Sequence, residues 1–308
     1  VSVNGQDQAV VTLQENNGVV LVDLATKEIT KVFSAGSVAV SGIDVKKDGT
    51  IDQTGSIPVT PREPDAVAWV DEHHVATANE GDWKGGTRGW TVFDTRTGEP
   101  TWDAGNTLER LAVRTGLHTE DRAAKKGVEI EGLSIATING TRYAFVGSER
   151  SNFVAVYDVS DPAAPRYLQV LPTTNGPEGI LPIASRGLLA VSSETDDATK
   201  GVRSSVALYA LGQGGSTFPT IESDDVPGQD GTPIGWSALG ALTADPVDPT
   251  TLYTASDTVL TNGRIFTVDV SGTPARITHE TVVKDGEGAP VALDVEGLFA
   301  RPQGGFWL

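Results

Sequence analysis

The sequence predicts an all-β fold, a β-propeller of four-stranded antiparallel blades, and three observations lead to this prediction. Blocks of short apolar runs recur at intervals of about 40 to 50 residues, which is the spacing of propeller blades. Within a block, the runs are separated by turn residues such as Asn139-Gly140. The chain of 308 residues is 38% hydrophobic and 21% charged, so it can bury a core and is not of the disordered class.

The clearest block begins at Glu131. Glu131-Gly132-Leu133 opens an apolar run that ends at Ile138, and Asn139-Gly140 provides a turn into the next run. Three further runs of strand character cover residues 143–149, 153–159 and 167–171. Four short strands joined by turns make one blade.

Similar blocks begin at Glu63, Glu178 and Glu296, and another covers residues 238–269 without an opening Glu. The first apolar runs of the chain, 10–15 and 19–23, resemble second and third strands and would complete the blade that opens at Glu296. Either the two ends close that blade, or the protein continues, because residues 306–308 already resemble a second strand. We count about five or six visible blades, and a total of seven is also possible.

We expect a single propeller domain over residues 1–308 with two insertions, at about 103–127 and 212–236. We expect the first insertion to form a short helix and an exposed loop. The second is rich in Gly, Ser, Asp and Pro, which predicts a loop excursion from the blades. The chain starts at Val1 without an initiator Met or a signal peptide, so we interpret it as a trimmed form, truncated at both ends.

Composition and charge exclude several classes of function. Asp and Glu number 41 against 23 Lys and Arg, a net charge of −18, which repels phosphate backbones and makes nucleic acid an unexpected partner. No run approaches the roughly 20 apolar residues of a membrane helix, so we expect no membrane insertion. Without Cys there are no disulfides, thiolate metal sites or Cys nucleophiles. Nothing in the sequence indicates the oligomeric state.

The repeat brings acidic residues to one face. In a propeller, the start of each first strand and the end of each second strand lie at the same mouth of the channel, and here both positions carry carboxylates. Converging carboxylates repel one another unless a cation neutralises them, and oxygen donors suit Ca²⁺. The predicted metal-binding residues are Glu63, Glu131, Glu178 and Glu296 at the starts, and Glu80, Glu149 and Glu194 at the ends.

Basic residues lie near the same face, each close to the start of a third strand. Arg suits bidentate contacts with phosphate or carboxylate, which predicts a small anionic or phosphorylated ligand. The alternative is structural: each Glu binds backbone amides and each Arg pairs with a neighbouring Glu. The predicted ligand-binding residues are Arg88, Arg150, Arg203 and Arg264.

A second candidate ion site lies in the segment 44–52. Asp44, Asp48-Gly49 and Asp52 keep part of the spacing of a calcium loop, but Lys46 stands at a ligand position and Gly55 replaces the closing Glu. A plain hairpin turn at Asp48-Gly49 is the competing interpretation.

Several segments together resemble the phytase-like propeller family, described as having esterase-like activity and including surface-anchored bacterial members. They are residues 62–68 (REPDAVA), 76–82 (ATANEGD), 131–133 (EGL) and 147–150 (GSER). The resemblance implies an extracellular or cell-surface protein with Ca²⁺ at the channel mouth, bound to phosphate. Only Glu63, Glu80, Glu131 and Glu149 lie inside matching segments. The block at 237–240 lacks the opening Glu, which breaks the inner ring.

Three functions follow as hypotheses. The first is a calcium-dependent phosphoester hydrolase, the second a non-catalytic surface propeller that binds a ligand or a protein, and the third a lactonase or esterase suggested by fold analogy. No catalytic residue can be named from the sequence, which has no Gly-x-Ser-x-Gly nucleophile motif.

Overall fold

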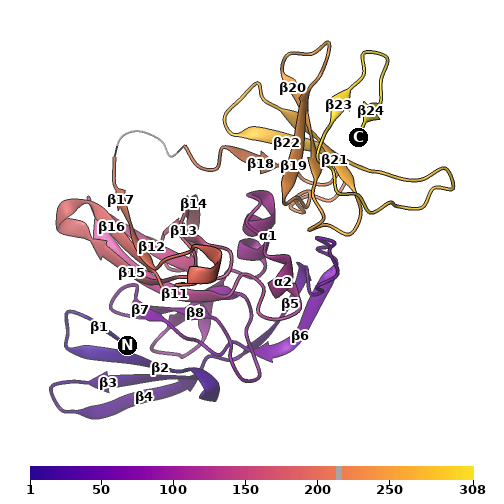
Figure 1. Cartoon of the computed structure of the whole chain (residues 1–308). Helices are drawn as coiled ribbons and strands as arrows, with labels where there is room; N and C mark the ends of the chain where they lie inside the picture. Colours follow the sequence, from indigo (N-terminus) through magenta and orange to yellow (C-terminus); the bar gives the residue numbers. More distant parts are fainter. Residues whose placement is uncertain (213–216) are drawn as a thin grey trace. The chain divides into compact units, whose positions relative to one another are not determined.

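The computed structural model describes residues 1–212 and 217–308 (Figure 1). Strands make up 47% of the residues and helices 7%, so the prediction of an all-β fold is confirmed. The chain divides into two compact units: the first comprises 1–41, 56–108 and 126–215, and the second 42–55, 109–125 and 216–308. The single domain over residues 1–308 stays a prediction.

The first unit contains four antiparallel sheets whose strands follow chain order. The first consists of β1 (Ser2–Val3), β2 (Gln8–Leu13), β3 (Gly18–Asp23) and β4 (Glu28–Ser34), and the second of β7 (Val67–Trp69), β8 (His74–Asn79), β9 (Gly89–Asp94) and β10 (Pro100–Asp103). The third consists of β11 (Ile130–Ile138), β12 (Thr141–Ser148), β13 (Phe153–Asp158) and β14 (Arg166–Pro172), and the fourth of β15 (Pro177–Ile183), β16 (Leu188–Ser193) and β17 (Ser205–Ala210). Short 3₁₀ turns cover Gln14–Asn16, Ala184–Arg186 and Ala198–Lys200.

The first sheet differs from the prediction. We expected the beginning of the chain to supply only second and third strands, but β1 pairs with β2 through Ser2 and Val3 and gives this sheet a first strand of its own. The sheet is therefore complete in four strands. The sequence pattern missed β1 because a strand of two residues carries no periodic signal.

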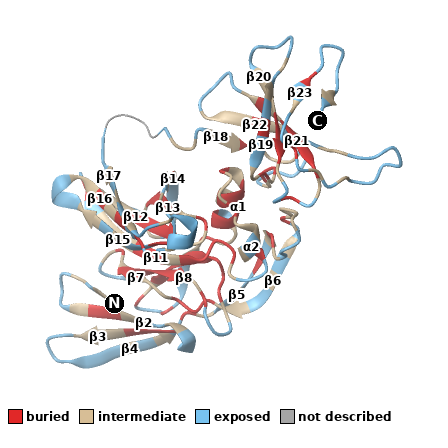
Figure 2. Cartoon of the chain, viewed as in Figure 1, coloured by how far each residue is buried: buried red, intermediate tan, exposed pale blue. Residues whose placement is uncertain are grey.

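Successive sheets of the first unit pack face to face through their innermost strands: β7 contacts β1 and β2, β11 contacts β7 and β8, and β15 contacts β11 and β12. Apolar side chains fill the interfaces, for example Val10, Val75 and Phe93 between the first two sheets, and Phe145 and Leu189 between the last two. Figure 2 shows buried residues between these sheets, and the longest buried runs lie in β8, β9, β12 and β13. Such packing of successive four-stranded sheets is typical of propeller blades.

The second unit contains a five-stranded sheet and a two-stranded one. The five-stranded sheet has the order β18 (Ile221–Ser223), β22 (Ala275–Val282), β21 (Arg264–Asp269), β20 (Thr251–Ser256) and β19 (Leu239–Ala244), and β18 runs parallel to β22. The small sheet pairs β23 (Phe299–Ala300) with β24 (Phe306–Trp307). Part of the predicted excursion at 212–236 forms strand β18, and residues 213–216 lie outside the described part.

The segment 103–127 contains α1 (Thr107–Arg114) and α2 (Glu120–Ala123). The predicted short helix corresponds to α1, and the segment that follows is partly buried: Thr115 and His118 are buried, whereas Asp121 and Lys125 are exposed. Apolar side chains at helical spacing place one face of α1 in the core.

A separate ribbon pairs β5 (Ser37–Ile43) with β6 (Gly55–Pro61).

Candidate functional site

Three carboxylates of the first unit come together where first and second strands meet. Asp65 lies just before β7, Glu80 directly follows β8, and Glu131 lies in β11. One oxygen atom from each lies within 4.8 Å of the others. We call these three residues the acidic cluster. They come from two sheets whose innermost strands are in contact.

A repeated backbone conformation sets the direction of these side chains. Ahead of the first strand in four sheets stands a residue with positive φ: Glu63 (46°), Glu129 (51°), Gly176 (69°) and Ala238 (47°). A register shift follows in the third sheet, between Ile130 and Leu133. A β-bulge of this kind turns a side chain away from the regular pleat. The residue two positions after the positive φ is acidic in three of these sheets: Asp65, Glu131 and Glu178. In the five-stranded sheet it is Gly240.

The Glu-Gly-aliphatic motif has a packing reason at the same bulge. A Cβ atom on Gly132 would lie 2.8 Å from the carbonyl oxygen of Glu178, in the next sheet. A Cβ atom on Gly179 would lie 2.4 Å from the Oγ of Ser192. Glycine at position 132 lets the backbone of Glu178 in the next sheet approach closely, and glycine at position 179 leaves room for the Ser192 hydroxyl of its own sheet.

Two side chains already hold Glu80. The Nζ of Lys126 lies 2.8 Å from its Oε1, and the Nε2 of Gln14 donates a hydrogen bond of 2.7 Å to its Oε2. The Nζ of Lys126 is also 3.5 Å from Asp82 and 3.5 Å from Glu129. Burial lowers the pKa of Lys126, but the hydrogen bond and charge of Glu80 outweigh it and leave the pKa raised.

The acidic cluster holds more negative charge than these partners neutralise. Burial, together with the hydrogen bond and charge of Glu149 and the charges of Glu80 and Asp65, raises the pKa of Glu131 to about 9. Burial and the negative charges of Glu80 and Glu178 raise the pKa of Asp65. Carboxylates with raised pKa values favour a proton or a cation. The arrangement can therefore bind a positive ion through oxygen atoms.

Replacing Glu131 with Gln should stabilise the cation-free protein at alkaline pH. The pKa of Glu131 in the folded protein, about 9, lies above its ordinary value of 4.5. Between these two pH values the folded chain binds more protons than the unfolded chain, so the stability contributed by this group falls as the pH rises. Glutamine does not ionise and escapes this loss. Thermal unfolding in chelator from pH 5 to 9 should show the advantage of Glu131→Gln growing with pH, and an advantage independent of pH would contradict the assignment.

The structure places Glu63 differently from the prediction. Its buried carboxylate accepts hydrogen bonds from backbone N–H groups, from Asp82 and Trp83 at Oε2 and from Lys84 at Oε1, each at 2.8 Å. These contacts give Glu63 the role that the structural alternative describes, and metal binding by Glu63 stays a prediction. Asp65 occupies the position at the bulge that was assigned to Glu63.

Three of the other four predicted metal-binding residues belong to the first unit and one to the second. Glu149 lies beside the acidic cluster: burial and the charge of Glu129 raise its pKa, against the lowering effects of Glu131 and Arg150. Glu178 and Glu194 are exposed at its border, where the charge of Glu178 raises the pKa of Asp65 and a hydrogen bond with Glu194 raises the pKa of Glu149. Glu296 is an exposed residue of the second unit.

The predicted set of four arginines does not form one anion-binding group. Arg150 is beside the cluster and pairs with Glu149 at 2.7 Å and with Glu129 at 3.2 Å. Arg203 pairs with Asp196 at 3.2 Å on the surface. Arg264, in the second unit, pairs with Glu280 at 2.6 Å, and Arg88 is buried just before β9. Only Arg150 is placed by the described contacts next to the acidic cluster.

The three aspartates of the predicted calcium loop at 44–52 have separate partners in the structure. The Asp48 carboxylate accepts a hydrogen bond from the Thr50 N–H, and that of Asp52 from the Thr54 N–H, so each holds a local turn. Asp44 is buried instead and groups with His118 and Glu120.

Sequence reasoning missed Asp65, Lys126 and Gln14. For Asp65 a signal existed: Asp65-Ala66-Val67 has the same acidic, small, aliphatic order as Glu131-Gly132-Leu133 and Glu178-Gly179-Ile180. The more conspicuous Glu63 two positions earlier concealed it. Lys126 and Gln14 reach Glu80 from distant parts of the chain, and no local pattern indicates them.

Two family models match this chain. The model of the choice-of-anchor I domain matches residues 1–85 and 84–162, which together are residues 1–162 of 308. The chain belongs to the choice-of-anchor I domain family. The phytase-like model, described as esterase-like activity of phytase, matches residues 234–308, so the resemblance to that family is confirmed. A choice-of-anchor domain implies a cell-surface or secreted protein. In the described part of the chain, no helix is both long and apolar enough to cross a membrane.

Solved structures similar to this choice-of-anchor I protein have low identity and low TM-scores. The mitotic checkpoint complex matches with a TM-score of 0.39 and 12% identity over 98% of this chain and 66% of that one. The RRP9 WD40 repeats match with 0.39 and 10% over 98% and 69%, and a protein from Lactobacillus plantarum with 0.38 and 17% over 92% and 69%. The chain spans about two-thirds of the length of each of these structures. No curated protein matches the chain in sequence.

Proposed function

We propose that this choice-of-anchor I protein is a surface-associated or secreted propeller that binds Ca²⁺ at Asp65, Glu80 and Glu131. The observation that carries the proposal is the convergence of these three carboxylates within 4.8 Å, two of them with raised pKa values. A bound cation would remove the repulsion that raises those values. The binding energy would also favour the folded chain.

The donor set fits Ca²⁺ better than a transition metal. All three side chains of the cluster offer oxygen atoms, and Ca²⁺ takes six to eight oxygen ligands in flexible geometry. Glu149, Glu178 and Glu194 at the border could add oxygen atoms, directly or through water. Lys126 and Gln14 fix the Glu80 carboxylate, so Asp65 and Glu131 have the most charge to offer.

The match to the phytase-like family makes a phosphoester the first substrate class to examine. When bound, Ca²⁺ would supply a positive charge for a phosphoryl oxygen. Arg150 is the residue of this chain that could donate further hydrogen bonds to such an anion, after releasing Glu149 or Glu129. Lys126 would keep Glu80 oriented through the same contact.

A second candidate function is ligand binding without catalysis, and the ion pairs that the predicted arginines already make favour it. Arg150 already pairs with Glu149 and Glu129, Arg203 pairs with Asp196, and Arg264 pairs with Glu280. Among the four predicted arginines, the described contacts bring Arg150 to the acidic cluster. On this account Ca²⁺ would hold adjacent sheets together and present a charged surface to a ligand.

Calcium should raise the thermal unfolding midpoint of the wild-type chain. A ligand present at 100 times its Kd stabilises the folded state by about 2.7 kcal/mol, which corresponds to several degrees in a chain of this size. Glu131→Gln should lose most of this increment. The exposed Glu99→Gln is the matched control and should keep it. Equal increments in wild type and Glu131→Gln would contradict the site.

Turnover on the same samples separates the two candidate functions. Release of phosphate from a chromogenic phosphoester that rises with Ca²⁺, stops in chelator and is lost in Glu131→Gln supports hydrolysis. A thermal increment without turnover supports the binding function. The absence of both a thermal increment and turnover would overturn the proposal.

A further inference from the structure

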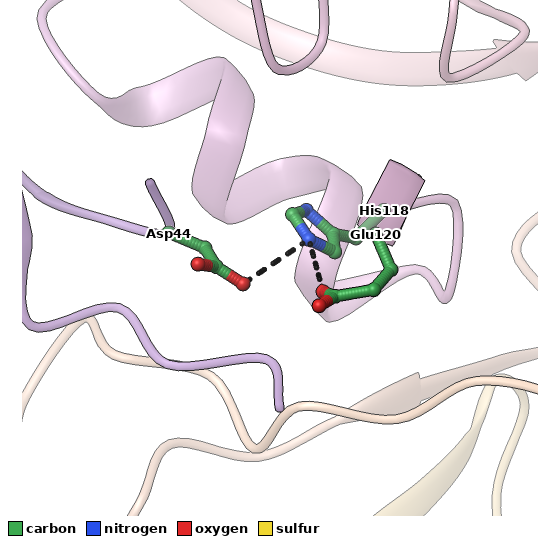
Figure 3. Close-up of side chains that lie close together, drawn as sticks. All are labelled: Asp44, His118 and Glu120. Carbon is green, nitrogen blue, oxygen red and sulfur yellow. Dashed lines mark ion pairs between the residues drawn. The ribbon is translucent and has the colours of Figure 1, made fainter. Parts of the chain in front are cut away.

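We infer that Asp44, His118 and Glu120 form a separate metal site that takes a divalent transition-metal ion of the Zn²⁺ type. All three residues belong to the second unit, and none is part of the acidic cluster. Figure 3 shows the imidazole of His118 between the two carboxylates. We call this group the His118 site.

The spacing of the donor atoms is that of metal ligands rather than of hydrogen-bond partners. The Nε2 atom of His118 lies 3.5 Å from Oδ2 of Asp44 and 3.6 Å from Oε2 of Glu120 (Figure 3). Charge-assisted hydrogen bonds are shorter, about 2.7 to 2.9 Å. Ligands placed tetrahedrally at about 2.0 to 2.1 Å from Zn²⁺ are roughly 3.4 Å apart. Both measured separations are close to that value.

Two of these atoms are buried without a hydrogen-bond partner. The side chain of His118 is 1% exposed, and within the described residues neither its Nε2 atom nor Oε2 of Glu120 has a hydrogen-bond partner. Buried polar atoms in folded proteins are nearly always satisfied, so an unsatisfied pair indicates an absent ion or water. A metal ion between Nε2 and Oε2 would satisfy both atoms at once.

Backbone hydrogen bonds fix the orientation of both carboxylates. Oε1 of Glu120 accepts the N–H groups of Asp48 and Gly49 at 2.9 and 2.6 Å, and Oδ1 of Asp44 accepts the N–H of Lys46 at 3.0 Å. In each carboxylate the other oxygen atom is the one that faces His118. Outer contacts of this kind orient ligands in known metal sites and tune their affinity.

The donor chemistry indicates the metal. One imidazole and two carboxylates suit Zn²⁺, whereas Ca²⁺ prefers oxygen ligands alone. A proton is the competing occupant: burial lowers the pKa of His118, but Asp44 and Glu120 outweigh this effect and raise the pKa to about 9. Three protein ligands leave a fourth position open for water or a further ligand, as in catalytic rather than structural zinc sites.

Zinc binding to the full chain, measured by titration calorimetry, tests the site. The wild type should bind about one Zn²⁺, and Co²⁺ in its place should give the visible absorption of a tetrahedral centre. His118→Gln and Glu120→Gln should each weaken binding at least about 10-fold, the scale on which even outer-shell partners act. His279→Gln removes an exposed histidine of the same unit and should leave the affinity unchanged.

Two results would overturn the inference. One is the absence of Zn²⁺ binding to the wild type at millimolar concentration, which would leave the group as an ion-paired imidazolium. The other is binding that survives in both His118→Gln and Glu120→Gln with normal circular dichroism. Should His118→Gln fail to fold, Glu120→Gln alone decides, because it keeps the size of the side chain. Displacement of Zn²⁺ by equimolar Ca²⁺ would overturn the choice of metal.

Discussion

Replacing Arg62 with Leu is expected to lower the free energy of unfolding by about 3 to 5 kcal/mol, the cost of breaking a buried ion pair from one side. The buried guanidinium donates to the carbonyl oxygen of Ala35 at 2.8 Å and to Oγ1 of Thr91 at 3.1 Å. It also donates two hydrogen bonds, of 3.0 and 2.9 Å, to Oδ2 of Asp103. Leucine would leave all three acceptors without this donor, and one of them is a carboxylate.

Arg96→Leu is the matched control for this prediction. Arg96 also donates two hydrogen bonds to a carboxylate, one to each oxygen of Asp94 at 3.0 and 2.7 Å, but its side chain is 59% exposed. Exposed pairs of this kind contribute about 0 to 1 kcal/mol. Urea unfolding should separate the two variants clearly. Similar losses for both would mean that the Arg62 contacts add no more than a surface pair.

The fold class was predictable because it depends on local periodicity. The runs expected at residues 143–149 and 153–159 correspond to β12 and β13, and the turn at Asn139-Gly140 joins β11 to β12. Alternation and turn residues are properties of adjacent positions, so the sequence alone contains them. The single propeller domain stays a prediction, because the arrangement of distant segments depends on long-range contacts that no local pattern specifies.

The acidic cluster was predictable in part for the same reason. Glu80 and Glu149 follow the ends of second strands, and Glu131 opens a first strand, so strand order alone places them at one end of their sheets. Glu63 could not be assigned correctly, because its role depends on positive φ and on the fold of residues 82–84. The long arginine side chains reach whichever carboxylate the fold brings near, as Arg264 reaches Glu280.

Glu63→Ala is expected to destabilise the protein by about 3 kcal/mol or more while leaving its response to Ca²⁺ intact. The carboxylate accepts three backbone hydrogen bonds from residues 82–84. A single hydrogen bond to a charged group contributes about 1.5 to 3 kcal/mol, and the three contributions do not simply add. Since both its oxygen atoms are engaged by this loop, we expect Glu63 to contribute no metal ligand. Its removal should loosen the loop without removing a donor from the acidic cluster.

The comparison with Glu131→Gln makes this prediction decisive. Glu63→Ala should unfold at lower urea concentration yet keep the calcium-induced rise in the thermal midpoint, whereas Glu131→Gln should stay stable and lose that rise. Glu99→Ala, on an exposed turn, should change neither quantity. If Glu63→Ala abolished the calcium response and kept its stability in the absence of the ion, Glu63 would be a ligand after all. The acidic cluster would then have to include the loop that Glu63 now holds.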